Sequence, residues 1–107
     1  MDYAAFVNRL FAKRNLGADG LMHAAVGVAG EAGELLDAIK KVWVYSKPLD
    51  RENVIEELGD VEFYAQALRS LLDITREETI AANVAKLQRR YPEGYTDAAA
   101  IARADKA

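Results

Sequence analysis

Two short acidic pairs constrain the fold of this chain more than any other feature of its sequence. The first pair is Glu31 and Glu34, and the second is Glu57 and Asp60. A spacing of i, i+3 places both members of a pair on one face of a helix. Apolar residues surround each pair, and carboxylates beside a core are costly unless a positive group meets them. If the two pairs lie on neighbouring helices and face each other, their carboxylate oxygens would form a binding site for a divalent cation, and Mg²⁺ is the natural occupant.

The rest of the sequence predicts an all-α protein. Helical spacing of apolar residues recurs along the chain, and no strand-like alternation stands out. We expect helices over residues 2–15, 21–45, 51–72, 75–90 and 96–103. The expected N-caps are Asp2, Asp50 and Thr75. Residues 17–20 are expected to form a turn, and the chain from residue 104 onward is expected to fray.

Length and composition predict one small domain, residues 1–107, with a single core. The absence of cysteine excludes disulfides and zinc–thiolate sites and is compatible with a cytoplasmic setting, and one histidine is too few for a histidine-rich metal site. A net charge of −3 argues against nucleic acid as the main partner. No apolar run is long enough to span a bilayer and no signal peptide is indicated, so no membrane partner is expected.

Glycines accompany both acidic pairs. Gly27, Gly30 and Gly33 lie inside the second expected helix, and Gly59 separates Glu57 from Asp60. Each glycine costs about 1 kcal/mol relative to alanine in a helix interior. Close approach of another backbone or of a ligand would justify that cost, so the pattern predicts two helices that cross tightly at a shared site.

Converging carboxylates with a divalent ion could carry out phosphate chemistry. A metal ion polarises phosphorus and acidifies a bound water, and a carboxylate that is not fully engaged by metal can take the proton of that water. Phosphate binding also needs cations away from the acids. The fourth expected helix offers Lys86, Arg89 and Arg90, and the end of the second offers Lys40 and Lys41.

Four motifs follow one another along the chain: Gly30-Glu31-Ala32-Gly33-Glu34-Leu35, Glu57-Leu58-Gly59-Asp60, Asn83-Val84-Ala85-Lys86-Leu87 and Arg90-Tyr91-Pro92-Glu93-Gly94-Tyr95. In this order they resemble the MazG-like family of all-α nucleoside triphosphate pyrophosphohydrolases, and the resemblance covers residues 21–95. It implies a bundle of four to five helices of the MazG or dimeric dUTPase type, assembled as a homodimer or a dimer of dimers.

The resemblance also implies a reaction and a set of residues. The reaction is cleavage of a nucleoside triphosphate between the α and β phosphates, which yields a monophosphate and pyrophosphate. The cofactor is Mg²⁺, with Mn²⁺ as a substitute, held by Glu31, Glu34, Glu57 and Asp60. One acid of the first pair would orient the water, and we favour Glu31 over Glu34. The residues that would contact substrate are Tyr64, Asn83, Lys86, Arg90 and Tyr91.

Several alternatives stay open at this point. Deoxynucleotides such as dGTP are favoured, whereas the chain is short for the dimeric dUTPases, and phosphoribosyl-ATP is a further substrate of related compact enzymes. A non-enzymatic helical dimerisation or adaptor module would explain apolar residues on more than one helix side, as in residues 42–45. A di-iron carboxylate bundle is disfavoured because it needs Glu-x-x-His motifs, which this chain lacks.

Overall fold

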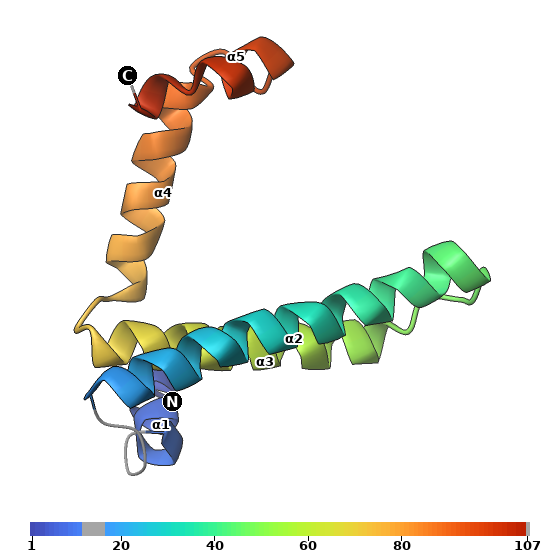
Figure 1. The fold of residues 1–107 in the computed structure, drawn as a ribbon, viewed down its shortest axis with the longest axis vertical. Helices are drawn as coiled ribbons and strands as arrows, with labels where there is room; N and C mark the ends of the chain where they lie inside the picture. Colours follow the sequence, from blue (N-terminus) through green and yellow to red (C-terminus); the bar gives the residue numbers. More distant parts are fainter. Residues whose placement is uncertain (12–16, 107) are drawn as a thin grey trace. The chain divides into compact units, whose positions relative to one another are not determined.

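The computed structural model describes residues 1–11 and 17–106 (Figure 1). Within these residues it contains five α-helices, one short 3₁₀ helix and no strand beyond a bridge between Pro92 and Gly94, which confirms the all-α fold class. The chain divides into two compact units, residues 1–73 and residues 74–107, and each is described by itself. That residues 1–107 form one domain stays a prediction.

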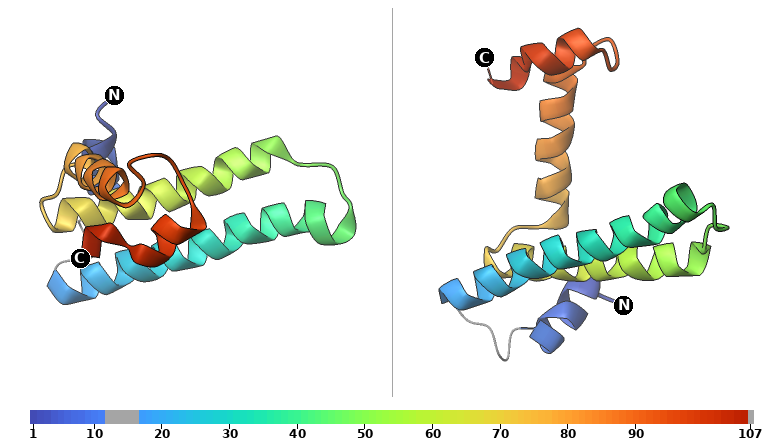
Figure 2. Two further views of the ribbon diagram at one scale, coloured as in Figure 1. Left: turned by 90° about the horizontal axis from the view of Figure 1, so that it is seen from above. Right: turned by 45° about the vertical axis from the view of Figure 1, so that its right-hand side comes forward.

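Unit 1 is built on a helical hairpin. Helix α2 (Gly17–Tyr45) packs against helix α3 (Arg51–Leu71). Figure 2 shows the two helices side by side, joined by the loop that follows α2. Asp50 begins α3 as its N-cap, because its carboxylate accepts a hydrogen bond of 3.1 Å from the backbone N–H of Asn53. The loop and the cap therefore lie where the sequence predicts them.

A third helix, α1 (Tyr3–Phe11), packs against α3 in unit 1. Its expected cap is confirmed, because the carboxylate of Asp2 accepts a hydrogen bond of 3.2 Å from the backbone N–H of Ala5. Residues 12–15, with which this helix was expected to continue, lie outside the described residues. The turn expected over residues 17–20 is wrong, because α2 already begins at Gly17. Asp19 suits the first turn of a helix, and the burial of Gly20 shows that packing overrides the turn preference of glycine here.

The core of unit 1 is small and lies where all three helices meet. Val7 and Phe11 from α1 are buried with Ala24 from α2 and Ala67 from α3. The partly buried residues around them are Phe6, Phe63, Tyr64, Leu68 and Leu71. Two of the four buried residues are alanines, so this core gains limited stabilisation from buried apolar area.

Unit 2 contains α4 (Arg76–Arg90), α5 (Asp97–Ala102) and the 3₁₀ helix η1 (Ala104–Lys106). The predicted capping box begins α4: Thr75 accepts from the backbone N–H of Glu78, and the Glu78 carboxylate accepts from that of Thr75. A turn follows α4, in which Gly94 has a φ of 90°, a backbone conformation that favours glycine.

The expectation of a fraying C-terminal segment is wrong for residues 104–106. The guanidinium group of Arg90 donates two hydrogen bonds to the Asp105 carboxylate, from Nε at 2.8 Å and from Nη2 at 3.1 Å. The Asp105 side chain is only 4% exposed. This two-point pair fixes η1 against the end of α4.

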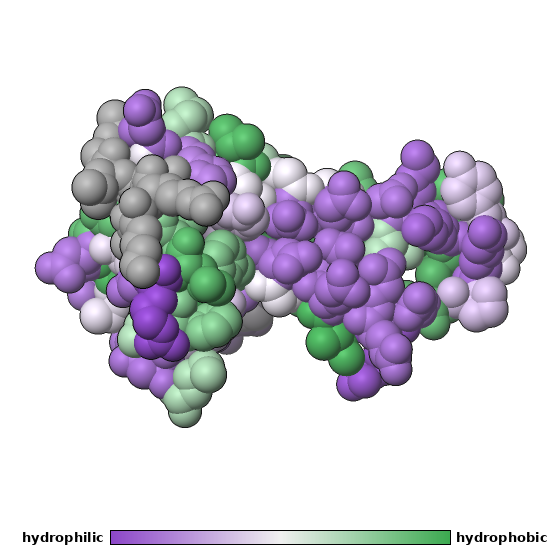
Figure 3. All heavy atoms as spheres, turned by 90° about the horizontal axis from the view of Figure 1, so that it is seen from below, coloured by the Kyte–Doolittle hydropathy of each residue, from purple (hydrophilic) through white to green (hydrophobic). Residues whose placement is uncertain are grey.

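A large part of the apolar surface remains uncovered in the single chain. Figure 3 shows green, hydrophobic residues between purple, hydrophilic ones on one face. The exposed large hydrophobic residues of α2 include Met22, Val26, Leu36 and Trp43. No helix among the described residues has the length and apolar character needed to cross a membrane.

Candidate metal centre

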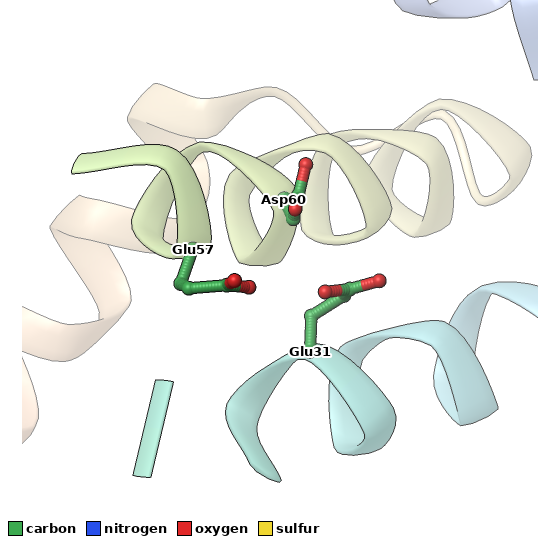
Figure 4. Close-up of side chains that lie close together, drawn as sticks. All are labelled: Glu31, Glu57 and Asp60. Carbon is green, nitrogen blue, oxygen red and sulfur yellow. The ribbon is translucent and has the colours of Figure 1, made fainter. Parts of the chain in front are cut away.

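Three of the four predicted acids lie together between α2 and α3. One carboxylate oxygen from each of Glu31, Glu57 and Asp60 lies within 4.8 Å of the others, and all three residues are half-buried. Figure 4 shows Glu31 extending from α2 toward Glu57 and Asp60 on α3. The i, i+3 spacing explains this geometry, because it places Glu57 and Asp60 on the side of α3 that faces α2. We call these three residues the acid triad.

The geometry and chemistry of the acid triad fit a hard divalent cation. Ligand oxygens on opposite sides of Mg²⁺ are about 4 Å apart, and those of Ca²⁺ about 5 Å apart. The triad oxygens lie within 4.8 Å of one another, a separation that one divalent ion can span, and all the donors are carboxylates. Within the described residues, no lysine or arginine forms an ion pair with any of the three. A bound cation would relieve the repulsion among these carboxylates.

The electrostatics of Glu57 reflect this crowding. Removal from solvent raises the pKa of Glu57 above its ordinary value, and the negative charges of Asp60, Glu31, Glu34 and Glu56 raise it further. Each of these effects disfavours the ionised carboxylate. A cation at the triad would act in the opposite direction and favour the ionised form.

Glu34 does not belong to the acid triad. It is exposed on α2, one turn beyond Glu31, and acts on the triad through its charge, as one cause of the raised pKa of Glu57. Glu31 and Glu34 share a face of α2, but only Glu31 is level with Glu57 and Asp60, and Glu34 remains exposed to solvent.

Tyr64 lies one turn beyond Asp60 on α3 and belongs to an aromatic cluster with Phe11 and His23. The ring centroid of Tyr64 is 6.4 Å from that of Phe11 and 6.0 Å from that of His23. The ring also covers Gly27, where an added Cβ would overlap it. Close approach thus explains Gly27, whereas Gly30, Gly33 and Gly59 have nothing within 4 Å of such a Cβ. The prediction that these three glycines allow the helices to cross tightly is therefore wrong within this chain.

The remaining predicted residues lie in unit 2. Asn83 and Lys86 are exposed on α4. Arg90 is bound to Asp105, and the Tyr91 ring packs against the Tyr95 ring at a centroid distance of 5.1 Å. Sequence reasoning missed Asp105 as the partner of Arg90, because no local motif connects positions so far apart.

Comparison with known proteins decides the family. The sequence model of one protein family, the MazG nucleotide pyrophosphohydrolase domain, matches residues 22–95 of this chain. The matched region includes the acid triad and Asn83, Lys86, Arg90 and Tyr91. The chain belongs to the MazG family. It is also similar to the Gene 37 protein of Mycobacterium phage L5, with 32% identity over an alignment of 80 residues, and the match covers 71% of this chain and 70% of that protein. No solved structure matches the chain.

The MazG match gives the acid triad a chemical context. The MazG domain is a nucleotide pyrophosphohydrolase domain, so a nucleotide is the class of substrate that the family supports. Nucleotide phosphates and carboxylates are both ligands that hard divalent cations prefer. A site of three carboxylates at the surface of a MazG hairpin is therefore suited to hold a divalent metal ion that also contacts phosphate oxygens.

Proposed function

We propose that this MazG protein hydrolyses nucleoside triphosphates between the α and β phosphates, in the cytoplasm, with Mg²⁺ as cofactor and Mn²⁺ as a substitute. Water is consumed, and a nucleoside monophosphate and pyrophosphate are released. Deoxynucleoside triphosphates, with dGTP first, are the preferred substrates in this proposal. The observation that carries it is the acid triad, which lies inside the region of the MazG match.

The acids have distinct roles in this proposal. Glu31, Glu57 and Asp60 hold the metal, and Glu34, which is exposed beside them, completes the ligand set when metal and substrate bind. A bound metal would supply charge neutralisation at the phosphates and would make a bound water more acidic. Glu31 orients the attacking water and accepts its proton, with Glu34 one turn away as the neighbouring carboxylate.

Residues outside the triad bind the nucleotide. Lys86 and Arg90 provide positive charge for the phosphates, while Asn83, Tyr91 and Tyr64 contact the nucleoside or the phosphates. Asp105 accepts one hydrogen bond from Nε and one from Nη2 of Arg90, so a phosphate oxygen would bind to the N–H groups of the guanidinium that Asp105 does not use.

We further propose that the protein is a homodimer or a dimer of dimers. The core of unit 1 is small, and Trp43 is 84% exposed together with Met22, Val26 and Leu36 on the same helix. Exposed apolar surface of this extent usually marks a contact with another molecule. A symmetric self-association is the commonest way to cover it.

The test is a product assay with the purified protein, Mg²⁺, the common nucleoside and deoxynucleoside triphosphates and dUTP. Phosphorus NMR should show a monophosphate and pyrophosphate, and the order of the rates identifies the base and sugar. Asp60→Asn should abolish turnover, whereas Glu77→Gln, which removes an exposed acid outside the triad, should keep it. Full activity of Asp60→Asn would contradict the proposal. If phosphoribosyl-ATP is the one compound that is hydrolysed, the protein is a phosphoribosyl-ATP pyrophosphohydrolase instead.

The exposed apolar surface also favours a second candidate, a non-enzymatic dimerisation or adaptor module. Thermal unfolding separates the two candidates. An enzyme should gain more stability from Mg²⁺ and a nucleotide together than from the sum of either alone, because both meet at one site. An adaptor should show no such joint effect.

A further inference from the structure

A cavity of about 570 Å³ lies in unit 1 where α2 ends and α3 begins. Its walls come from the last turns of α2, the connecting loop and the first turn of α3. Three cationic side chains line it: Lys41, Lys47 and Arg51. Neither the sequence motifs nor the MazG match assigns a role to this cavity.

The cavity opens along the same pair of helices that carries the acid triad. Asn53, which lines the cavity, lies one turn before Glu57 on α3, or about 6 Å along the helix axis. Ala38, on the opposite wall, lies two turns beyond Glu31 on α2, or about 10 Å along the axis. A ligand held at the triad can therefore extend into the cavity without leaving the hairpin.

The three cations are available to a ligand. Among the described residues, neither Lys47 nor Arg51 forms an ion pair. Lys41 is 3.8 Å from Asp37, but both side chains are more than half exposed, and such surface pairs hold weakly.

Two acids also line the cavity and reduce its positive charge. The carboxylate of Asp50 is engaged, because it caps α3 through the backbone N–H of Asn53 at 3.1 Å. Glu52 is exposed in the first turn of α3, where the helix dipole favours a negative side chain. The unengaged groups of the cavity are therefore mainly cationic.

The other end of the hairpin has the opposite character. Phe11, His23 and Tyr64 cluster there, with the rings of Phe11 and His23 at a centroid distance of 5.0 Å. Phe11 is buried in the core, so His23 and Tyr64 are the rings at this end that suit the flat face of a base, whereas a pyrophosphate group requires cations. The acid triad thus lies between an aromatic end and a cationic end.

We propose that this cavity binds the β and γ phosphates of the substrate, with Lys47 and Arg51 as the main contacts and Lys41 as a third. The inference rests on the proposed function, because it assumes that the bond to be cleaved lies at the triad. It gives the substrate a direction along the hairpin, with the base toward Tyr64 and the pyrophosphate half toward the loop after α2.

The test measures binding of inorganic pyrophosphate with Mg²⁺ to the 107-residue protein by isothermal titration calorimetry. Lys47→Ala and Arg51→Ala should each weaken binding at least tenfold, and Lys47→Arg should restore most of it, because the positive charge is kept. Lys40→Ala is the matched control, since Lys40 is an exposed cation on α2 that does not line the cavity. Binding of dGMP should be the same in all variants, and circular dichroism should show unchanged helix content.

Each outcome is decisive for the cavity. Equal pyrophosphate affinity in wild type, Lys47→Ala and Arg51→Ala would overturn the inference, and so would no binding to the wild type. Turnover is measured separately on the same samples. If the enzyme releases pyrophosphate but its pyrophosphate affinity does not depend on Lys47 and Arg51, the proposed function stands and the inference fails. If Lys47 and Arg51 support pyrophosphate binding but no triphosphate is turned over, the proposed function fails, and the cavity is a pyrophosphate site without a role in this reaction.

Discussion

Replacing Gly27 by alanine should destabilise unit 1. The added Cβ would overlap the Tyr64 ring, including Cγ, the ring atom closest to the backbone. A contact at this root of the side chain cannot be relieved by a small movement of the far end of the ring. Either α2 and α3 must separate locally or Tyr64 must leave its position beside Phe11 and His23.

The size of the effect follows from a comparison with Gly30. Overpacking of this kind costs about 1–3 kcal/mol. Alanine in place of a helical glycine stabilises the helix by about 1 kcal/mol at either position. Because an added Cβ at Gly30 meets nothing within 4 Å, Gly30→Ala carries the gain without the clash. Gly27→Ala should therefore be less stable than Gly30→Ala by about 1–3 kcal/mol, or at least about 4 °C in Tm.

Urea unfolding followed by circular dichroism measures this difference, with Gly33→Ala as a second open-space control. The background Tyr64→Ala separates the ring from other causes, because without the ring Gly27→Ala should behave like Gly30→Ala. The two substitutions should thus show a favourable coupling in a double-mutant cycle. Equal stability of Gly27→Ala and Gly30→Ala, or the same loss with and without the Tyr64 ring, would refute the reasoning.

Three further predictions concern caps and charges. Thr75→Ala should lower the stability of unit 2 by about 1 kcal/mol in urea unfolding, because it removes the capping box with Glu78; an unchanged midpoint would contradict this. The hydrogen bonds from Arg90 hold the pKa of Asp105 below its ordinary value. These bonds therefore stabilise the folded protein fully at a pH above the ordinary pKa, and this stabilisation is lost as the pH falls through the lowered pKa. Backbone amides of η1 should therefore exchange with solvent faster in Asp105→Asn than in the wild type near neutral pH, and at the same rate in acid. A difference that does not change with pH would rule out the ionised Arg90–Asp105 pair as the cause. The raised pKa of Glu57 means that its ionised carboxylate destabilises the folded protein near neutral pH. In the presence of a metal chelator, Glu57→Gln should therefore have a higher Tm than the wild type at neutral pH, and the difference in Tm should disappear as the pH falls through the raised pKa. A lower Tm of Glu57→Gln at neutral pH would contradict this prediction.

The acid triad could be predicted because its signal is local. Helical periodicity fixes which side chains share a face, and the i, i+3 spacing brought Glu57 and Asp60 together as expected. The exposed position of Glu34 could not be predicted in the same way. Whether Glu31 or Glu34 points at the neighbouring helix depends on the rotation of α2 about its own axis, which the packing of Ala24 and Gly27 decides.

Contacts between positions far apart in the chain could not be predicted from the sequence. The caps at Asp50 and Thr75 were predicted because each connects residues three apart. Arg90 was assigned to the substrate from its motif, and its pair with Asp105 depends on how the chain turns after Tyr91. The glycines at 17 and 20 favoured a turn by propensity, but tertiary packing buries Gly20 within α2.

The position of α1 has a practical consequence for anyone who shortens this protein. The MazG match begins at residue 22, yet α1 contributes Val7 and Phe11, the two large side chains of the four-residue buried core. At the other end the match stops at residue 95, before the carboxylate that neutralises Arg90. A fragment trimmed to residues 22–95 would keep all four motifs of the family resemblance but lose both the core side chains of α1 and the partner of Arg90, so the matched region is shorter than the part of the chain that stabilises the fold.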